Sequence, residues 1–293
     1  MLNKLICWIF RLVIRYYSGK AIEERRNINK LYQKFISPLK SNVAKVNGNI
    51  MVLDKYDSSC LSITGVYEEF ATEVIKQIIK EGAMVLDIGA YIGYYTLLFA
   101  KLVGNKGKVF AFEPSPDNFR ILIDNVKVNN YANVEAIQKA AGFKEGKAIL
   151  FLHDFNTGRN RMALPYGQKS IEVEVVNLDK YFIDYIKPFN FIKIDAEGME
   201  YDILKGMARI LTGSNDIKIM IEFFPRYLDI SGADPKEFLS LLKQYRFKYY
   251  RINEWRKKLE DIGEDKLLKQ YTVDKNNYTN LLCTKEGQNN IGF

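Results

Sequence analysis

The chain has 293 residues, of which 47% are hydrophobic and 27% are charged, proportions typical of a globular protein with one large domain and room for an appendage. Its net charge of +8 is carried by residues 1–50, which contain ten Lys and Arg residues but only Glu23 and Glu24 as acids. Because the rest of the chain is electrically balanced, the composition argues against a nucleic-acid-binding surface on its main part.

Cysteine and histidine usage argues against two further classes of protein. The three cysteines are far apart and form no CxxC pair, and His153 is the only histidine. The sequence therefore predicts neither a disulfide framework nor a histidine-based metal site, and we assign no metal. This pattern is typical of a reducing compartment, so we expect a cytoplasmic protein.

Residues 1–18 contain an apolar run, LNKLICWIFRLVIRYY, that Lys4, Arg11 and Arg15 interrupt on one helical face. Its longest uncharged part, residues 5–10, is far shorter than the roughly 20 residues of a spanning helix. Arginines within the apolar run also argue against a signal peptide. Two interpretations stay open: a helix lying on the cytoplasmic face of an anionic membrane, or a helix docked on its own domain or on a partner.

Three segments are expected along the chain. Residues 1–45 form a basic, partly amphipathic helical segment. The dipeptide Asn47-Gly48 between apolar runs predicts a β-hairpin, and we assign residues 46–66 to this lead-in. Residues 67–293 form the main domain.

The main domain alternates strands with helices, a pattern that predicts a parallel sheet with right-handed crossovers. The expected strands are Met84–Ile88, Val109–Glu113, Val134–Gln138, Phe191–Asp195, Ile217–Phe223, Lys248–Ile252 and a last one near Tyr278–Thr284. The last two have no helix between them, which predicts one antiparallel strand in a mostly parallel, doubly wound α/β sheet.

Residues 147–177 interrupt this alternation with two stretches typical of an inserted β pair around a polar loop. The loop contains His153, Arg159 and Arg161. His153 is either a base facing the substrate or an exposed loop residue. The two arginines either meet an acidic sugar or a phosphate, or lie on a solvated surface. For all three we favour the exposed interpretation.

The stretch VLDIGAYIGYYT predicts a strand, a glycine turn and a helix, the usual frame of a nucleotide site. A dinucleotide fingerprint needs three glycines, but here only Gly89 and Gly93 are present, and Tyr91 places a bulky side chain in the turn. Such a turn suits a ligand without a diphosphate. Asp87 is favourable beside a sulfonium or an ammonium group, and Gly89 gives room for the methionine part of S-adenosylmethionine.

The next strand ends in VFAFEP, so that Glu113 follows Gly89 by 24 residues. An acid near this spacing accepts hydrogen bonds from ribose hydroxyls. Together the two motifs predict a nucleotide site that favours S-adenosylmethionine. A nicotinamide-dependent oxidoreductase on the same kind of sheet is the alternative.

A third cluster, NFIKIDAEGMEYDILKG, brings Lys193, Asp195, Glu197 and Glu200 to the end of a strand and the start of a helix. Acids at a helix start are favoured by its free N–H groups and its dipole. This explains Glu200, but it does not explain such a concentration of charge at the end of a central strand.

With these motifs the chain resembles the FkbM family of S-adenosylmethionine-dependent methyltransferases, over about residues 62–225. The matching segments, in order, are Gly65-Val66-Tyr67-Glu68, VLDIGAYIGYYT, FEPSPDNF, NLDKYF, IKIDAEGMEYDILKG and IMIEF. The resemblance implies a class I methyltransferase fold, which is Rossmann-like. It also implies O-methylation of a hydroxyl on a saccharide, a glycolipid or another secondary metabolite.

Carried over by position, the resemblance implies two sets of site residues. Those around S-adenosylmethionine are Glu68, Asp87, Gly89, Ala90, Tyr91 and Gly93 at the methionine part, Glu113 and Pro114 at the ribose, and Ala140 and Ala141 at the adenine. Those facing the acceptor are Asp195, Glu197 and Glu222.

Methylation of a hydroxyl needs a base, and with a single histidine a carboxylate is the expected one. Asp195 is the first choice because a strand end is rigid; Glu197 and Glu222 follow. Lys193 either keeps a neighbouring carboxylate ionised or packs under the sheet with its amine paired. The expected partner is a small-molecule or glycan acceptor. No base-flipping motif follows Asp195, so we expect no nucleic acid.

Overall fold

The structure is a computed structural model, which describes residues 41–153, 156–162 and 169–287. Residues 1–18, for which membrane contact is a prediction, lie outside the described residues, as does nearly all of the basic segment 1–45. Within the described part of the chain, every helix is too short or too polar to cross a membrane.

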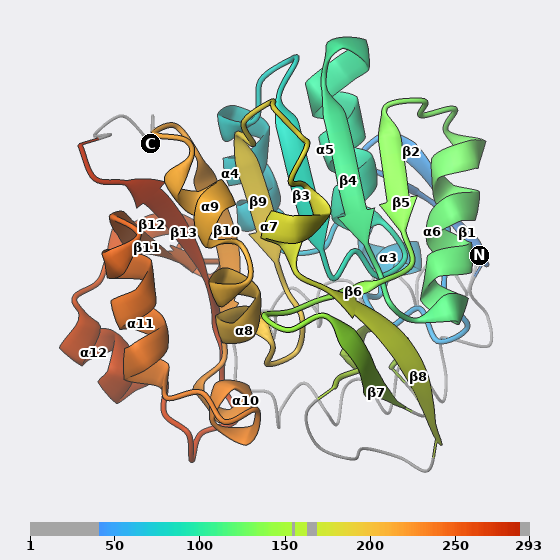
Figure 1. Cartoon of the computed structure of the whole chain (residues 1–293). Coiled ribbons are helices and arrows are strands. Elements are labelled where there is room, and N and C mark those ends of the chain that lie inside the picture. The colour runs from blue at the N-terminus through green and yellow to red at the C-terminus, as the bar shows by residue number, and fades with distance from the viewer. Residues whose placement is uncertain (1–40, 154–155, 163–168, 288–293) are drawn as a thin grey trace.

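The core is one eight-stranded sheet with the strand order β12-β11-β13-β10-β9-β3-β4-β5 (Figure 1). Its strands are β3 (Met84–Ile88), β4 (Lys108–Phe112), β5 (Val134–Ile137), β9 (Phe191–Ile194), β10 (Lys218–Phe223), β11 (Phe247–Asn253), β12 (Lys258–Asp261) and β13 (Thr279–Lys285). Strands β10, β9, β3, β4 and β5 pair in parallel. This confirms the predicted class I methyltransferase fold.

The closing part of the sheet differs from the prediction in two respects. The helix α12 (Glu264–Gln270) lies between the last two predicted strands, where the sequence predicts no helix. Two strands run antiparallel, where the sequence predicts one: β13 inserts between β10 and β11, and the short edge strand β12 pairs with β11. Strand β12 escapes sequence analysis because its four residues, KLED, are mostly charged. An edge strand needs no continuous apolar pattern, since only one of its sides is paired.

Helices cover both faces of the sheet (Figure 1). One face packs against α4 (Glu69–Ile78), α5 (Tyr94–Val103) and α6 (Pro116–Val128). The other packs against α7 (Leu178–Tyr181), α8 (Glu200–Lys205), α9 (Ala208–Thr212), α10 (Pro225–Ile230), α11 (Pro235–Gln244) and α12 (Glu264–Gln270). Successive strand residues point to opposite faces, so both core clusters draw on the same strands.

The predicted hairpin is present as β1 (Val43–Val46) and β2 (Asn49–Val52). Its turn residues, Asn47 and Gly48, have φ values of 49° and 83°, the left-handed geometry of a two-residue hairpin turn. The hairpin docks on α6, where the Asn125 side chain hydrogen-bonds both backbone groups of Val52. A short helix, α3 (Leu61–Thr64), leads from the hairpin toward α4.

The inserted region forms its own three-stranded sheet in the order β6-β8-β7. Strands β7 (Gly146–Leu152) and β8 (Lys169–Val176) pair antiparallel, and the two-residue strand β6 (Ala140–Ala141) runs parallel to β8. The 3₁₀ turn η3 (Thr157–Arg159) lies between β7 and β8. This small sheet projects from the edge at which β3, β4 and β5 end (Figure 1).

Candidate active site

The strand order reverses between β3 and β9. From β3 the chain continues to β4 and β5 on one side, whereas β9 is followed by β10 on the other. Loops that leave adjacent strands in opposite directions open a crevice at their carboxyl ends, and ligands of doubly wound sheets bind there. All three motifs of the sequence end at this edge.

Three charged side chains lie on the α4/α5 face of these strands. Asp87 of β3 and Lys193 of β9 are direct neighbours in the sheet. Glu222 of β10 points to the same face as Met220, two residues earlier, and Met220 packs on the α4/α5 face. The Lys193 Nζ lies 3.3 Å from Asp195 Oδ2 and 3.9 Å from Asp87 Oδ1. Strand alternation therefore gathers the charges of three apolar strands at one place.

Asp87 lies beneath the turn, with no exposed surface. Its Oδ2 accepts a hydrogen bond of 2.5 Å from Thr96 Oγ1 in the first turn of α5, while its Oδ1 has no hydrogen-bond donor. Burial raises the pKa of Asp87, although Lys193 and Thr96 both act to lower it. In this structure the carboxylate orients Thr96 and Lys193; direct contact with a donor molecule stays a prediction.

Both glycines of the turn have a positive φ, 77° and 95°, and Gly89 is also required by packing against backbone. A Cβ at Gly89 would lie 1.8 Å from the backbone oxygen of Asp195. At Gly93 a Cβ would lie 2.7 Å from Leu122 Cδ1 of α6. The sequence assigns Gly89 to ligand approach, but its first requirement is the contact between the loops after β3 and β9.

Three backbone donors of the turn are used within the fold. The N–H groups of Gly89 and Ala90 both donate to the Phe112 carbonyl, at 3.0 and 2.9 Å, and the Tyr91 N–H donates to Glu113 Oε2 at 2.9 Å. In a dinucleotide fold the glycine turn instead lets the backbone approach the pyrophosphate. This difference disfavours a nicotinamide cofactor.

Glu113 occupies the tip of β4 and is 5% exposed. Its Oε1 accepts from the Ser115 N–H at 2.9 Å and from Asn118 Nδ2 at 3.3 Å. Burial outweighs these hydrogen bonds and raises the pKa of Glu113 to about 7. The 3₁₀ turn of the inserted region covers this carboxylate, since Asn118 Nδ2 also donates to the Thr157 carbonyl and the Tyr91 hydroxyl lies 3.2 Å from Thr157 Oγ1.

The other residues predicted to contact the nucleotide are partly or fully buried. Pro114 is half-buried between Glu113 and Ser115. Ala140 and Ala141 follow β5 at the expected edge, but both are buried, one in the small cluster of the inserted sheet and one in the main core. Contact of these residues with ribose or adenine stays a prediction.

Glu68 stands immediately before α4 with a φ of 44°. Its Oε2 accepts a hydrogen bond of 2.6 Å from the Tyr95 hydroxyl. Burial raises the pKa of Glu68 to about 7, Tyr95 opposes this, and the charges of Glu254 and Asp195 add to it. Glu68 therefore titrates close to neutral pH.

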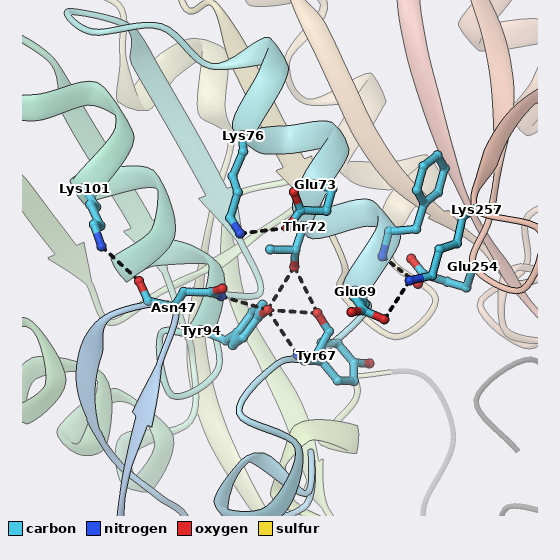
Figure 2. Close-up of polar contacts among 11 residues, drawn as sticks. Asn47, Tyr67, Glu69, Thr72, Glu73, Lys76, Tyr94, Lys101, Glu254 and Lys257 are labelled. Carbon is cyan, nitrogen blue, oxygen red and sulfur yellow. Dashed lines mark hydrogen bonds and ion pairs between the residues drawn. The ribbon is translucent and has the colours of Figure 1, made fainter. Parts of the chain in front are cut away.

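A hydrogen-bond node fixes the backbone on either side of Glu68 (Figure 2). The Tyr94 hydroxyl bonds both backbone groups of Tyr67, at 3.1 and 2.9 Å, and also contacts Asn47 Nδ2 and Thr72 Oγ1. On the other side, the Glu254 carboxylate accepts from the N–H groups of residues 70 and 71, which begin α4. These contacts hold the hairpin, α4, α5 and the end of β11 together.

The turn after β9 is strained and braced. Glu197 has a φ of 49°, which is uncommon for a residue other than glycine, and Gly198, with a φ of 108°, abuts the Tyr227 backbone. Glu200 is fully buried and accepts hydrogen bonds from the N–H groups of Ala196 and Gly198, at 2.8 and 3.0 Å. Glu200 thus holds the turn that presents Asp195 and Glu197.

Burial raises the pKa of two acceptor-side carboxyl groups. Burial, together with Asp195, raises the pKa of Glu197 to about 8 and raises the pKa of Glu222 well above its usual range. Burial lowers the pKa of Lys193, but the charges of Asp195 and other acids outweigh burial and raise it. Asp195 therefore faces a cation, and its side chain is 33% exposed, compared with 5% for Lys193.

The arginines of the inserted loop are not on a solvated surface. Arg161 is 8% exposed, and its guanidinium carbon lies 4.9 Å from the centre of the Tyr227 ring. Arg159 is half-buried and close enough to Glu197 to lower the pKa of that carboxyl. The favoured interpretation of the sequence was wrong for these two residues. The signal was available, because an insertion after the third strand begins at the carboxyl edge of the sheet.

His153 serves the loop itself. Its imidazole Nδ1 accepts a hydrogen bond of 3.0 Å from the Asn156 backbone N–H, and its backbone N–H donates one of 2.9 Å to Asn160 Oδ1. As for metals, the described residues contain no group of three or more His, Cys, Asp or Glu side chains placed to hold an ion.

Comparison with known proteins shows a match of residues 87–249 to the family described as the methyltransferase FkbM domain. The chain is 27% identical to the hexuronic acid methyltransferase AglP of Haloferax volcanii, over 59% of this chain and 67% of that protein. It is 28% identical to the protein-L-isoaspartate O-methyltransferase 1 of Arabidopsis thaliana, over 55% of this chain and 65% of that protein. The chain thus spans about two thirds of the length of these relatives.

Two solved structures align with about three quarters of the chain. An FkbM methyltransferase from Methylobacillus flagellatus aligns with a TM-score of 0.43 and 17% identity, covering 76% of this chain and 52% of that one. The fibrillarin of Aeropyrum pernix, solved with bound S-adenosyl-L-methionine, aligns with a TM-score of 0.42 and 12% identity, covering 73% of each chain.

Proposed function

The chain belongs to the FkbM family and is an S-adenosylmethionine-dependent methyltransferase, and on this premise we propose that it methylates a hydroxyl group of a saccharide, a glycolipid or another secondary metabolite. The observation that carries the proposal is the Asp195–Lys193 pair at the switch point of the sheet, beside Glu197 and Glu222. A similar protein, AglP, is named a hexuronic acid methyltransferase, which supports a sugar acceptor.

The residues of the donor side fit a cationic ligand without a diphosphate. The N–H groups of Gly89 and Ala90 are used within the fold, and a carboxyl group contacts each end of the following segment: Glu113 at Tyr91 and Glu68 at Tyr95. A carboxyl group attracts a sulfonium or ammonium and repels a phosphate. When bound, S-adenosylmethionine supplies a methyl group that its positive sulfur has already activated.

The chain's own contribution is to position the acceptor and remove its proton. A hydroxyl has to lose its proton during methyl transfer, whereas a carboxylate acceptor does not, so a base indicates a hydroxyl acceptor. Asp195 takes the proton at its carboxyl group, which lies 3.3 Å from the Lys193 amine. Burial raises the pKa of Glu222, which favours its protonated form, and in that form Glu222 can donate a hydrogen bond to the acceptor oxygen.

The alternative, a nicotinamide-dependent oxidoreductase, is disfavoured by the same turn. The methyltransferase and oxidoreductase hypotheses predict different ligands, so isothermal titration with S-adenosylmethionine and with NAD compares them directly. We expect binding of the first ligand only. Tight binding of NAD without S-adenosylmethionine would reverse the assignment.

The acceptor is found by comparing glycan and lipid extracts of cells with and without the gene by mass spectrometry. We expect a sugar-containing species to lose one methyl group in the deletion strain and to regain it when the purified chain and S-adenosylmethionine are added. Methylation that appears only on proteins or nucleic acids would contradict the proposed acceptor.

Peripheral membrane contact through residues 1–18 remains a separate proposal, motivated by the basic and apolar character of that segment. Deleting these residues and fractionating cells tests it. We expect the truncated chain to leave the membrane fraction, and an unchanged distribution would remove the proposal.

A further inference from the structure

A second group of side chains lies beside Asp195, Glu197 and Glu222 and has no part in the proton transfer described above. It consists of Arg159 and Arg161 from the inserted region and of the rings that surround α10. Its members come from segments far apart in the sequence, and they meet next to the Glu197 turn.

Arg161 is held in place on two sides. Its backbone pairs with Phe151 of β7 through hydrogen bonds of 2.8 and 3.1 Å. Its guanidinium group lies over the Tyr227 ring, 4.9 Å from the centre, in the arrangement of a cation–π contact. Arginine planes that stack on an aromatic ring keep their N–H edges directed outward for hydrogen bonding.

Aromatic rings continue from Tyr227. Its ring stacks on Phe224 with centroids 4.0 Å apart, and Phe224 lies 5.6 Å from the Tyr278 ring. Phe224 follows β10 directly and Tyr278 precedes β13. The rings therefore begin where β10 ends, two residues after Glu222 and at the acceptor side of the site. Aromatic rings of this kind pack against the apolar face of a ring-shaped ligand.

Arg159 lies among the same groups. Burial acts to lower the pKa of its guanidinium, but Glu197 and the hydroxyls of Tyr278 and Tyr227 raise it above its usual value. Burial and Asp195 raise the pKa of Glu197 to about 8, which favours its neutral form near pH 7. The arginines thus bring positive charge to the Glu197 turn, next to the η3 turn that covers Glu113.

We propose that Arg159 and Arg161 bind the acidic group of the acceptor and that the half-buried rings of Tyr227 and Tyr278 pack against its sugar ring, so that the enzyme selects an acidic sugar. Guanidinium groups bind carboxylates and phosphates through paired N–H donors. This inference rests on the proposed function and narrows its substrate class from saccharides in general to anionic ones.

The test is a binding measurement with three defined probes. Methyl β-glucuronide, methyl β-glucoside and glucose 6-phosphate are titrated into the full chain in the presence of S-adenosylhomocysteine, and binding is followed by saturation-transfer difference NMR. We expect the glucuronide to bind about tenfold more tightly than the glucoside, the change typical of losing one charged hydrogen bond. The phosphate probe shows which of the two anions the arginines prefer.

Variants assign the preference to residues. Arg159→Gln should weaken glucuronide binding by about tenfold and leave glucoside binding unchanged. Arg159→Lys, which keeps the charge but not the paired donors, should fall between. Arg226→Gln is the matched control, because Arg226 neighbours Tyr227 but is exposed, and it should bind like the unaltered chain. Arg161→Lys tests the second arginine, with a thermal melt to confirm folding.

Two results would overturn the inference. The first is equal affinity of the unaltered chain for glucuronide and glucoside. The second is an Arg159→Gln variant that retains the glucuronide preference while binding S-adenosylhomocysteine normally. The proposed function fails differently: a chain that binds glucuronide selectively but transfers no methyl group to any glycan would keep the acidic-sugar site and lose the methyltransfer to sugars.

Discussion

The two sides of the site are built on different principles. On the donor side, N–H groups of the turn after β3 donate hydrogen bonds to the Phe112 carbonyl of β4. Gly89 of this turn packs so closely against the Asp195 backbone that no Cβ would fit. On the acceptor side, Asp195 lies 3.3 Å from the Lys193 amine and is about one third exposed, at 33%. Left-handed residues occur on both sides, at Glu68 and at Glu197, and Asp87 and Glu222 each have a buried oxygen without a hydrogen bond. The two sides therefore differ in what their contacts fix: the donor side fixes a backbone turn, and the acceptor side presents an accessible carboxyl group beside a cation.

The largest expected effect is on kcat and comes from a substitution on the acceptor side alone. Asp195→Asn removes the proposed base while keeping the shape of the side chain, so kcat should fall by roughly 10²–10⁴. Affinity for S-adenosylmethionine should change little, because the donor side is intact. Single-turnover methyl transfer and isothermal titration measure the two quantities. Asp202→Asn, an exposed change on α8, is the control, and full activity of the Asp195 variant would exclude Asp195 as the base.

The second prediction concerns the stability of the donor-side turn at Gly89. Gly89→Ala introduces a Cβ 1.8 Å from the Asp195 backbone oxygen, so the free energy of unfolding should fall by about 3 kcal/mol or more. Gly232→Ala is a matched control, because Gly232 also has a positive φ, 86°, but nothing lies within 4 Å of the added carbon. The control should cost about 1–2 kcal/mol for backbone strain alone. Urea denaturation compares the two variants, and equal losses would mean that the close approach has no energetic importance.

The third prediction concerns the charge at the tip of β4. Because burial raises the pKa of Glu113 to about 7, the folded chain binds a proton that the unfolded chain has released. The free energy of unfolding of the ligand-free chain should therefore fall as pH rises from about 4.5 to 7. The share of Glu113 is about 2 kcal/mol. Glu113→Gln keeps an acceptor for the Ser115 N–H and removes the titration, so its stability should decline less over this range; identical pH profiles would contradict the assignment.

The smallest effect tests the support beneath Glu68. Glu254→Gln weakens the carboxylate that accepts the first N–H groups of α4 (Figure 2), and the free energy of unfolding should fall by about 1 kcal/mol. Glu73→Gln, on the same helix, disrupts only the exposed pair with Lys76 and should change stability by less than about 0.5 kcal/mol. Chemical denaturation distinguishes the two; equal effects would show that Glu254 adds no specific support.

The sequence by itself determined the local parts of this protein. Apolar periodicity located the strands, Asn47-Gly48 located the hairpin turn, and the motif around Gly89 located the strand–turn–helix unit at the switch point. These features depend on residues a few positions apart, where alternation and turn geometry leave few solutions. The motif around Asp195 likewise placed Lys193 and Asp195 at the end of one strand.

Only the tertiary structure decided how these parts meet. It buried Asp87 beneath its turn, brought Arg159 and Arg161 to the Glu197 turn, placed β13 between β10 and β11, and set Glu254 on a helix start 184 residues earlier. Such contacts join segments that no short-range pattern connects. They follow from the packing of the whole chain, because burial and charge at each position depend on which distant element covers it.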